Sequence, residues 1–199
     1  QKVPGRARSI RFWSSASKIT PPALEMGGNN PLVVWDLAGD DVEAAARIVV
    51  QSAFLSAGQR CTCARRLIVE DGREGPLVEA VLALTERLRI GCPFDDPQPF
   101  MGSLIDNRAA DGVLAGAAAM PGRVLRESRR AVQGLPFLQP GIVDVTGEAV
   151  DDRELFGPLL QIRRVGDFSA AIAAANATQF GLSAALLGGG RALYDRFWA

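Results

Sequence analysis

Hydrophobic residues follow two patterns along this chain. Short apolar runs with the length of buried strands occupy residues 31–35, 66–70, 122–128, 137–145, 159–165 and 182–188. Between these runs, apolar residues recur at intervals of three and four, as they do on one face of a helix. This exchange of strands and helices predicts an α/β fold with a mostly parallel sheet.

The helical pattern is clearest after the first run. Asp40 and Asp41 are suited to the beginning of a helix, and Gly58 is suited to its end. Between them, one apolar face comprises Val42, Ala45, Ala46, Val49, Val50, Ala53 and Phe54. Further helices are expected at 76–88, 109–120, 169–176 and 191–198.

Composition narrows the classes of function. Hydrophobic residues make up 48% of the chain, enough for a substantial core. The formal net charge is zero, which argues against a general binder of nucleic acid or of membrane surfaces. No apolar run reaches the roughly 18 residues that span a bilayer, and no signal peptide is recognisable. We therefore expect a cytoplasmic protein.

Two residue types restrict the chemistry. The three cysteines, Cys61, Cys63 and Cys92, are an odd number and do not suggest a disulfide framework. The chain contains no histidine, which excludes Ser-His-Asp and Cys-His catalysis and histidine-ligated metals within it. No metal site is expected. Catalysis would have to use carboxylates, thiols, hydroxyls, backbone dipoles or a cofactor.

Two segments with possible chemistry each precede a predicted strand. In residues 23–31, Glu25 stands beside a glycine pair and could act as a base if partly desolvated. The alternative is a solvated acid in a turn. In residues 56–63, Cys61 lies in a loop that could place its thiol at a sheet edge, where open α/β folds bind ligands. The alternative is a buried, inert cysteine.

The surroundings of Cys61 and a third segment add two expectations. Arg60, Arg65 and Arg66 could stabilise a thiolate at Cys61. In residues 154–158, Glu154 could present a carboxylate to ribose hydroxyls, and Phe156 could present a ring face to a flat base. Taken alone, this third segment is equally a loop that enters a strand.

The order and spacing of the three segments resemble the aldehyde dehydrogenase superfamily. The matching strings are Glu-Met-Gly-Gly from Glu25, Gly-Gln-Arg-Cys ending at Cys61, and Glu-Leu-Phe-Gly-Pro from Glu154. The resemblance runs from residue 23 to the end of the chain. The longer strings 25–34 and 51–66 resemble the N-succinylglutamate 5-semialdehyde dehydrogenases of arginine breakdown.

The resemblance implies a three-layer fold with helices on both faces of an open sheet, and a mechanism. Cys61 would attack an aldehyde to give a thiohemiacetal and then a thioester, which Glu25 would help water to hydrolyse. The Cys61 N–H would belong to the oxyanion hole. The cofactor would be NAD, with NADP left open: Glu154 would bind its nicotinamide ribose, Phe156 would pack near the nicotinamide, and the Met26 carbonyl would contact the carboxamide. The parent enzyme would be a homo-oligomer.

The ends of the chain depart from this pattern. Residues 1–22 carry five basic side chains and no acid, and they do not resemble the family's cofactor-binding domain. We expect them to be a poorly ordered, non-matching basic segment, or alternatively a basic arm. Residues 23–199 would be an incomplete catalytic domain, truncated at its C-terminus. An inactive fragment or a non-catalytic association module is therefore the alternative function.

Overall fold

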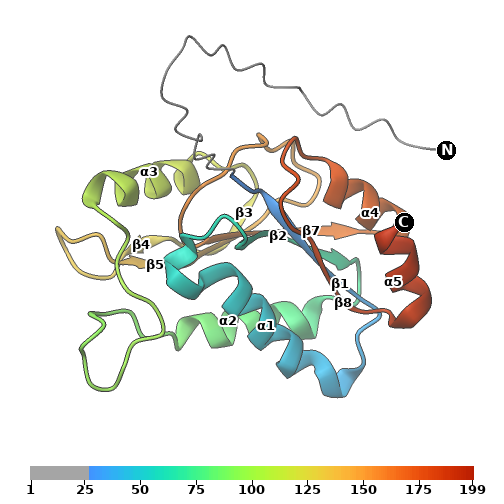
Figure 1. Cartoon of the computed structure of the whole chain (residues 1–199), viewed down its shortest axis with the longest axis horizontal. Helices are drawn as coiled ribbons and strands as arrows, with labels where there is room; N and C mark the ends of the chain where they lie inside the picture. The colour runs from blue at the N-terminus through green and yellow to red at the C-terminus, as the bar shows by residue number, and fades with distance from the viewer. Residues whose placement is uncertain (1–26) are drawn as a thin grey trace, which may run out of the picture.

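The computed structural model describes residues 27–199, which fold around one six-stranded sheet (Figure 1). The strand order is β3-β6-β7-β2-β1-β8, and every pair is parallel except β3 with β6. The strands of this sheet are β1 (Asn30–Trp35), β2 (Ala64–Glu70), β3 (Arg123–Arg126), β6 (Gly141–Asp144), β7 (Leu159–Val165) and β8 (Ala185–Gly188). The predicted α/β fold with a mostly parallel sheet is confirmed.

Helices connect the strands, and a small hairpin lies outside the main sheet. The α-helices are α1 (Val42–Phe54), α2 (Gly75–Glu86), α3 (Asn107–Ala118), α4 (Phe168–Asn176) and α5 (Gly190–Trp198). Short 3-10 helices, η1 (Gly39–Asp41) and η2 (Leu55–Gly58), flank α1. The hairpin pairs β4 (Arg129–Arg130) with β5 (Leu138–Gln139).

Side chains of β1 alternate between two apolar layers, as those of a strand buried on both faces must. Leu32 and Val34 pack in the larger layer, which includes residues of α1 and α2. Val33 and Trp35 pack in the other layer with residues of α4 and α5. The ring of Trp35 meets Phe168 of α4 edge to face, with centroids 5.5 Å apart. The sheet therefore has helices on both faces, as the resemblance implied.

The apolar face predicted for α1 is buried, but the helix is shorter than expected. Gly58 was expected to mark its end, whereas α1 ends at Phe54. The reason lies after Leu55, because Ser56, Ala57 and Gly58 all have positive φ, at 58°, 54° and 68°. Left-handed backbone cannot continue a right-handed helix. The chain therefore turns sharply before it enters β2.

One predicted strand is divided in two. The apolar run 137–145 forms β5 and β6, with Pro140 between them. Proline has no backbone N–H to donate to a sheet, so strands tend to break there. By contrast, β7 spans the predicted residues 159–165.

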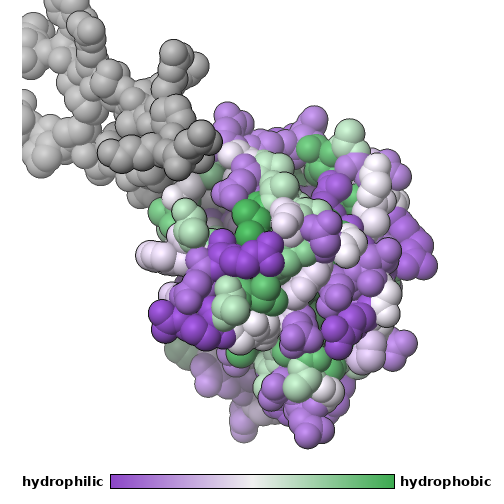
Figure 2. Space-filling view, turned by 90° about the vertical axis from the view of Figure 1, so that its right-hand side faces the viewer, coloured by the Kyte–Doolittle hydropathy of each residue, from purple (hydrophilic) through white to green (hydrophobic). Residues whose placement is uncertain are grey.

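The face that carries α4 and α5 has apolar residues scattered among polar ones (Figure 2). Tyr194 and Trp198 of α5 are 48% and 80% exposed, and no residue of that helix is buried. The second apolar layer is thus only partly covered by the described residues. No helix between residues 27 and 199 is long and apolar enough to cross a membrane.

Phe54 offers a test of this core, because its side chain is fully buried at the end of α1. Replacing it with alanine leaves a cavity, and we expect the free energy of unfolding in urea to fall by about 3–5 kcal/mol. Ile48 on the same helix is 43% exposed and is the matched control. Ile48→Ala should cost about 1 kcal/mol or less. Equal losses in the two variants would contradict the packing described.

Candidate active site

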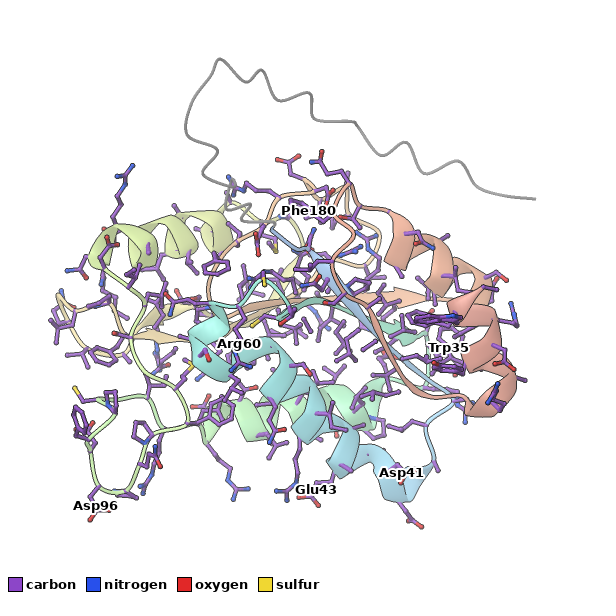
Figure 3. The ribbon with its side chains drawn as sticks, in the orientation of Figure 1. Trp35, Asp41, Glu43, Arg60, Asp96 and Phe180 are labelled. Carbon is purple, nitrogen blue, oxygen red and sulfur yellow. The ribbon has the colours of Figure 1, made fainter. Side chains whose placement is uncertain are left out.

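Three segments that precede strands meet at one end of the sheet. Strand β2 pairs in parallel with β1 on one side and β7 on the other. The segments that lead into these strands must therefore lie at the same end, the amino end. Figure 3 shows Arg60 and Phe180 towards that end, and Trp35 at the opposite end of β1. Ligands of open α/β sheets usually bind at the carboxyl ends of the strands. The Cys61 loop does lie at an end of the sheet, as expected, but at the amino ends of the strands.

Cys61 lies on an exposed loop whose backbone is held by hydrogen bonds from a buried side chain. Cys61 itself is exposed, whereas Cys63 is 3% exposed. Asn30, the buried first residue of β1, donates from Nδ2 to the carbonyls of Cys61 at 2.7 Å and Cys63 at 2.9 Å. Its Oδ1 accepts from the N–H of Ser183 at 3.2 Å. One amide side chain thus fixes the cysteine loop to two other segments.

The glycine pair passes between Cys61 and Glu154. A Cβ on Gly28 would overlap the carbonyl oxygen of Cys61 and the amide of Asn30. A Cβ on Gly27 would overlap a carboxylate oxygen of Glu154. The pair is needed here because only glycine lets the backbone come so close to both loops.

The turn before Cys61 is strained and tightly packed. The left-handed conformation of Ser56 and Ala57 costs roughly 1–2 kcal/mol for each residue. At the third left-handed position, Gly58, a Cβ would overlap the carbonyl of Gly157 in the segment before β7. The cysteine loop and the 154–158 segment are therefore in direct contact.

Arg65 connects these two segments by side-chain contacts. Its side chain is 2% exposed and forms an ion pair with Glu154 at 3.1 Å. The guanidinium carbon lies 5.4 Å from the ring centroid of Phe156, within the range of a cation–π interaction. Phe156 itself is 46% exposed. The segment of Glu154 and Phe156 thus lies next to the cysteine loop.

Arg66 connects a different pair of segments, the one before β1 and the end of α4. It donates to the carbonyl of Asn29 at 2.8 Å, and to the carbonyls of Ala174 and Ala175 at the end of α4, at 2.8 and 2.9 Å. The side chains of Arg65 and Arg66 are engaged by backbone carbonyls and by Glu154, and the expectation that they stabilise a thiolate at Cys61 stays a prediction. Both side chains hydrogen-bond to backbone carbonyls and organise the loops.

Asp152 completes a second network at this end of the sheet. It accepts hydrogen bonds from Asn29 at 2.8 Å, the hydroxyl of Thr178 at 2.8 Å and the N–H of Gln179 at 2.6 Å. Burial opposes its ionisation, but these hydrogen bonds and the nearby charge of Arg66 outweigh that effect. They hold the pKa of Asp152 below its ordinary value.

A cavity of about 1060 Å³ opens beside the site. It lies between α3 and the segment that contains Glu154 and Phe156, and Gln59 of the cysteine loop also lines it. The lining is mostly apolar, with polar side chains from the cysteine loop and from the segment of Glu154. Such a composition is typical of sites for small molecules and cofactors.

Two of the predicted site residues, Glu25 and Met26, lie outside the described residues, as does the segment 1–22. Conversely, no motif in the sequence pointed to Asn30 or Asp152, or to the contacts of Arg65 with both loops. A signal was present, since Asn30 and Arg65 are polar residues at or near the beginning of apolar strands. Buried polar groups in such places need specific partners.

Comparison with known proteins identifies relatives over nearly the whole chain. Residues 8–197 match the profile of the aldehyde dehydrogenase family, so the match begins within the segment 1–22. The N-succinylglutamate 5-semialdehyde dehydrogenase of Caulobacter sp. (strain K31) is 61% identical over 88% of this chain and 36% of its own length. The enzyme of the same name from Sphingopyxis alaskensis is 57% identical over 98% of this chain and 40% of its own length. The chain thus spans about two-fifths of the length of these relatives.

The fold is also similar to that of solved dehydrogenases. A Thermus 1-pyrroline-5-carboxylate dehydrogenase with bound NAD superposes with a TM-score of 0.75 at 29% sequence identity. The superposition covers 85% of this chain and 33% of that one.

Gly28→Ala tests the close approach of the glycine pair. The added methyl overlaps the Cys61 carbonyl, so we expect the free energy of unfolding to fall by about 1–3 kcal/mol and the alkylation rate of Cys61 to change. Gly112 of α3 has open space around its Cβ position and is the control. Gly112→Ala should leave Cys61 unaffected and raise stability by up to about 1 kcal/mol. An unchanged alkylation rate of Cys61 in Gly28→Ala would rule out the close approach of Gly28 to the Cys61 carbonyl.

Asp152 makes stability depend on pH. Because the pKa of Asp152 is lowered in the folded state, its charge stabilises the fold above the ordinary pKa of about 3.9, and this contribution disappears as pH falls through the folded value. Asp152→Asn should therefore be less stable than the parent near neutrality, and the two should converge in acid. Urea unfolding across this pH range checks it. A difference between the two proteins that stays the same at every pH would contradict this prediction.

Proposed function

The chain belongs to the aldehyde dehydrogenase family, and from this membership we propose that it carries the catalytic site of an enzyme that oxidises an aldehyde to a carboxylate with NAD. The observation that carries the proposal is the contact between the Cys61 loop and the segment of Glu154 and Phe156 beside a large cavity. A nucleophile and a cofactor-binding segment must be adjacent for such a reaction.

Cys61 is the nucleophile in this proposal. Its exposure and the fixed backbone of its loop suit attack on a substrate carbonyl. After the thiol has lost its proton, the sulfur forms a bond to the aldehyde carbon while the carbonyl π bond breaks and its electron pair moves to the oxygen. The N–H of Cys61 is the donor proposed to stabilise the negative charge on this oxygen in the resulting thiohemiacetal.

The residues that would hold the cofactor fit that role. Oε1 of Glu154 is engaged by Arg65, while its other oxygen faces the Gly27 backbone, and the side chain is 16% exposed. Carboxylate oxygens retain lone pairs that accept hydrogen bonds from ribose hydroxyls. Phe156 exposes ring surface for a flat heterocycle, and the cavity that both residues line is large enough for the nicotinamide half. When bound, NAD supplies the hydride acceptor of the reaction.

Glu25 is proposed as the base that completes turnover. Oxidation of the thiohemiacetal leaves a thioester on Cys61. Glu25 takes a proton from water, the oxygen of which forms a bond to the acyl carbon. The carbon–sulfur bond then breaks, releasing the carboxylate and restoring the sulfur.

The proposed substrate is N-succinylglutamate 5-semialdehyde. It is the aldehyde named in both close relatives, which are 61% and 57% identical to this chain. The reaction would place the protein in arginine breakdown, in the cytoplasm.

Formation of NADH from NAD and this aldehyde by the purified protein tests the proposal. Cys61→Ser should lower kcat by at least about a thousandfold. Glu25→Gln should still release a burst of NADH equal to the enzyme concentration, followed by slow turnover, because only hydrolysis is impaired. Cys92→Ser, which removes another exposed thiol, should have the same kcat as the parent protein. Full activity in Cys61→Ser, or none in the parent protein, would refute the proposed function.

A further inference from the structure

Arg65 is the most extensively bonded side chain at the site. Nη1 donates to the carbonyls of Gly58 at 3.0 Å and Gly157 at 3.4 Å. Nη2 donates to the carbonyl of Arg60 at 3.2 Å and to Oε1 of Glu154 at 3.1 Å. One buried guanidinium thus contacts both loops of the proposed active site.

The contact with the Arg60 carbonyl acts on the peptide group that carries the N–H of Cys61, the proposed oxyanion donor. The carbonyl of Arg60 and the N–H of Cys61 belong to the same planar, trans peptide unit, so they point in opposite directions. With its carbonyl directed at Arg65, the unit directs its N–H away from that guanidinium. Cys63 N–H donates to the same carbonyl at 3.1 Å and reinforces this orientation. Within residues 27–199, no acceptor receives the Cys61 N–H, which leaves it available to a substrate oxygen.

The same guanidinium also acts on the cofactor-binding segment. The ion pair holds the Glu154 carboxylate, and the guanidinium lies against the ring of Phe156. The planar fork of arginine can span such partners at fixed angles, whereas a lysine ammonium cannot. Loss of the fork would therefore release both loops together.

We propose that Arg65 is a positioning residue that couples the two halves of the active site. It orients the Arg60–Cys61 peptide for the oxyanion and, through the same guanidinium, sets the position of Glu154 and Phe156. This inference rests on the proposed function for its catalytic meaning. The mechanical coupling of the two loops rests on the contacts of Arg65 alone.

The coupling is tested by a double-mutant cycle on the alkylation of Cys61 in the folded protein. The four proteins are the parent, Arg65→Lys, Glu154→Gln and the double variant, with iodoacetamide as probe and the exposed Cys92 as internal reference. Each single substitution should change the rate for Cys61 relative to Cys92. The combined effect should differ from the product of the single effects by about twofold or more. A role in stability alone would not produce this coupling.

Steady-state kinetics supply the second readout. In Arg65→Lys, kcat should fall and the KM for NAD should rise, each by about tenfold, the effect of losing one hydrogen bond of a charged group. Arg126→Lys is the matched control, because the Arg126 side chain is only 11% exposed and is also bonded to a backbone carbonyl, that of Pro140, but contacts neither loop. It should leave Cys61 alkylation, kcat and KM unchanged.

The outcomes separate the two proposals. Multiplicative effects in the cycle, with kcat and KM unchanged in Arg65→Lys, would overturn the role of Arg65 whether or not the parent is active. If the parent forms no NADH but the cycle shows coupling, the loops are coupled as inferred and the proposed function is wrong. If Arg65→Lys does not fold, the Glu154→Gln protein decides: an unchanged Cys61 rate there overturns the coupling.

Discussion

The parallel pairing of β1, β2 and β7 is the constraint on which the rest of this structure depends. Leu32 of β1 faces Leu67 of β2, which faces Ile162 of β7. These side chains are fully buried, so a slip by one residue would move each of them into the layer on the opposite face of the sheet. The register therefore places the segments before the three strands side by side, although they are far apart in the sequence.

Buried polar side chains then decide how those segments meet. Asn30 and Arg65 lie at or near the beginnings of β1 and β2, where water cannot satisfy their donors. Their hydrogen bonds go to backbone carbonyls of the cysteine loop and of the segment before β7. An unpaired buried donor costs about 1–3 kcal/mol, so this arrangement is favoured over alternatives that leave either side chain unpaired. The same bonds offset the left-handed backbone of Ser56 and Ala57.

The two networks at this end of the sheet have different tasks. Arg65 holds the loops that carry the exposed thiol and the exposed aromatic ring, where a substrate and cofactor would bind. Arg66 and Asp152 hold Asn29, the end of α4 and the segment after it. Adjacent residues of β2 direct their side chains to opposite faces, which is why two consecutive arginines can support separate networks.

The sequence by itself determined where most strands and helices lie, apart from the end of α1 and the break at Pro140. Through the resemblance, it also determined the likeness of Cys61, Glu154 and Phe156 to the site of a known family. Periodicity suffices for the elements because it reflects which face of each one is buried. The partners of Asn30, Arg65 and Asp152 were decided only by the tertiary structure. A side chain's hydrogen bonds depend on which backbone carbonyls the sheet brings within about 3 Å, and residues 89 and 123 positions apart cannot be matched by local pattern. The order of the strands supplies that proximity, and this order exists only once the sheet has formed.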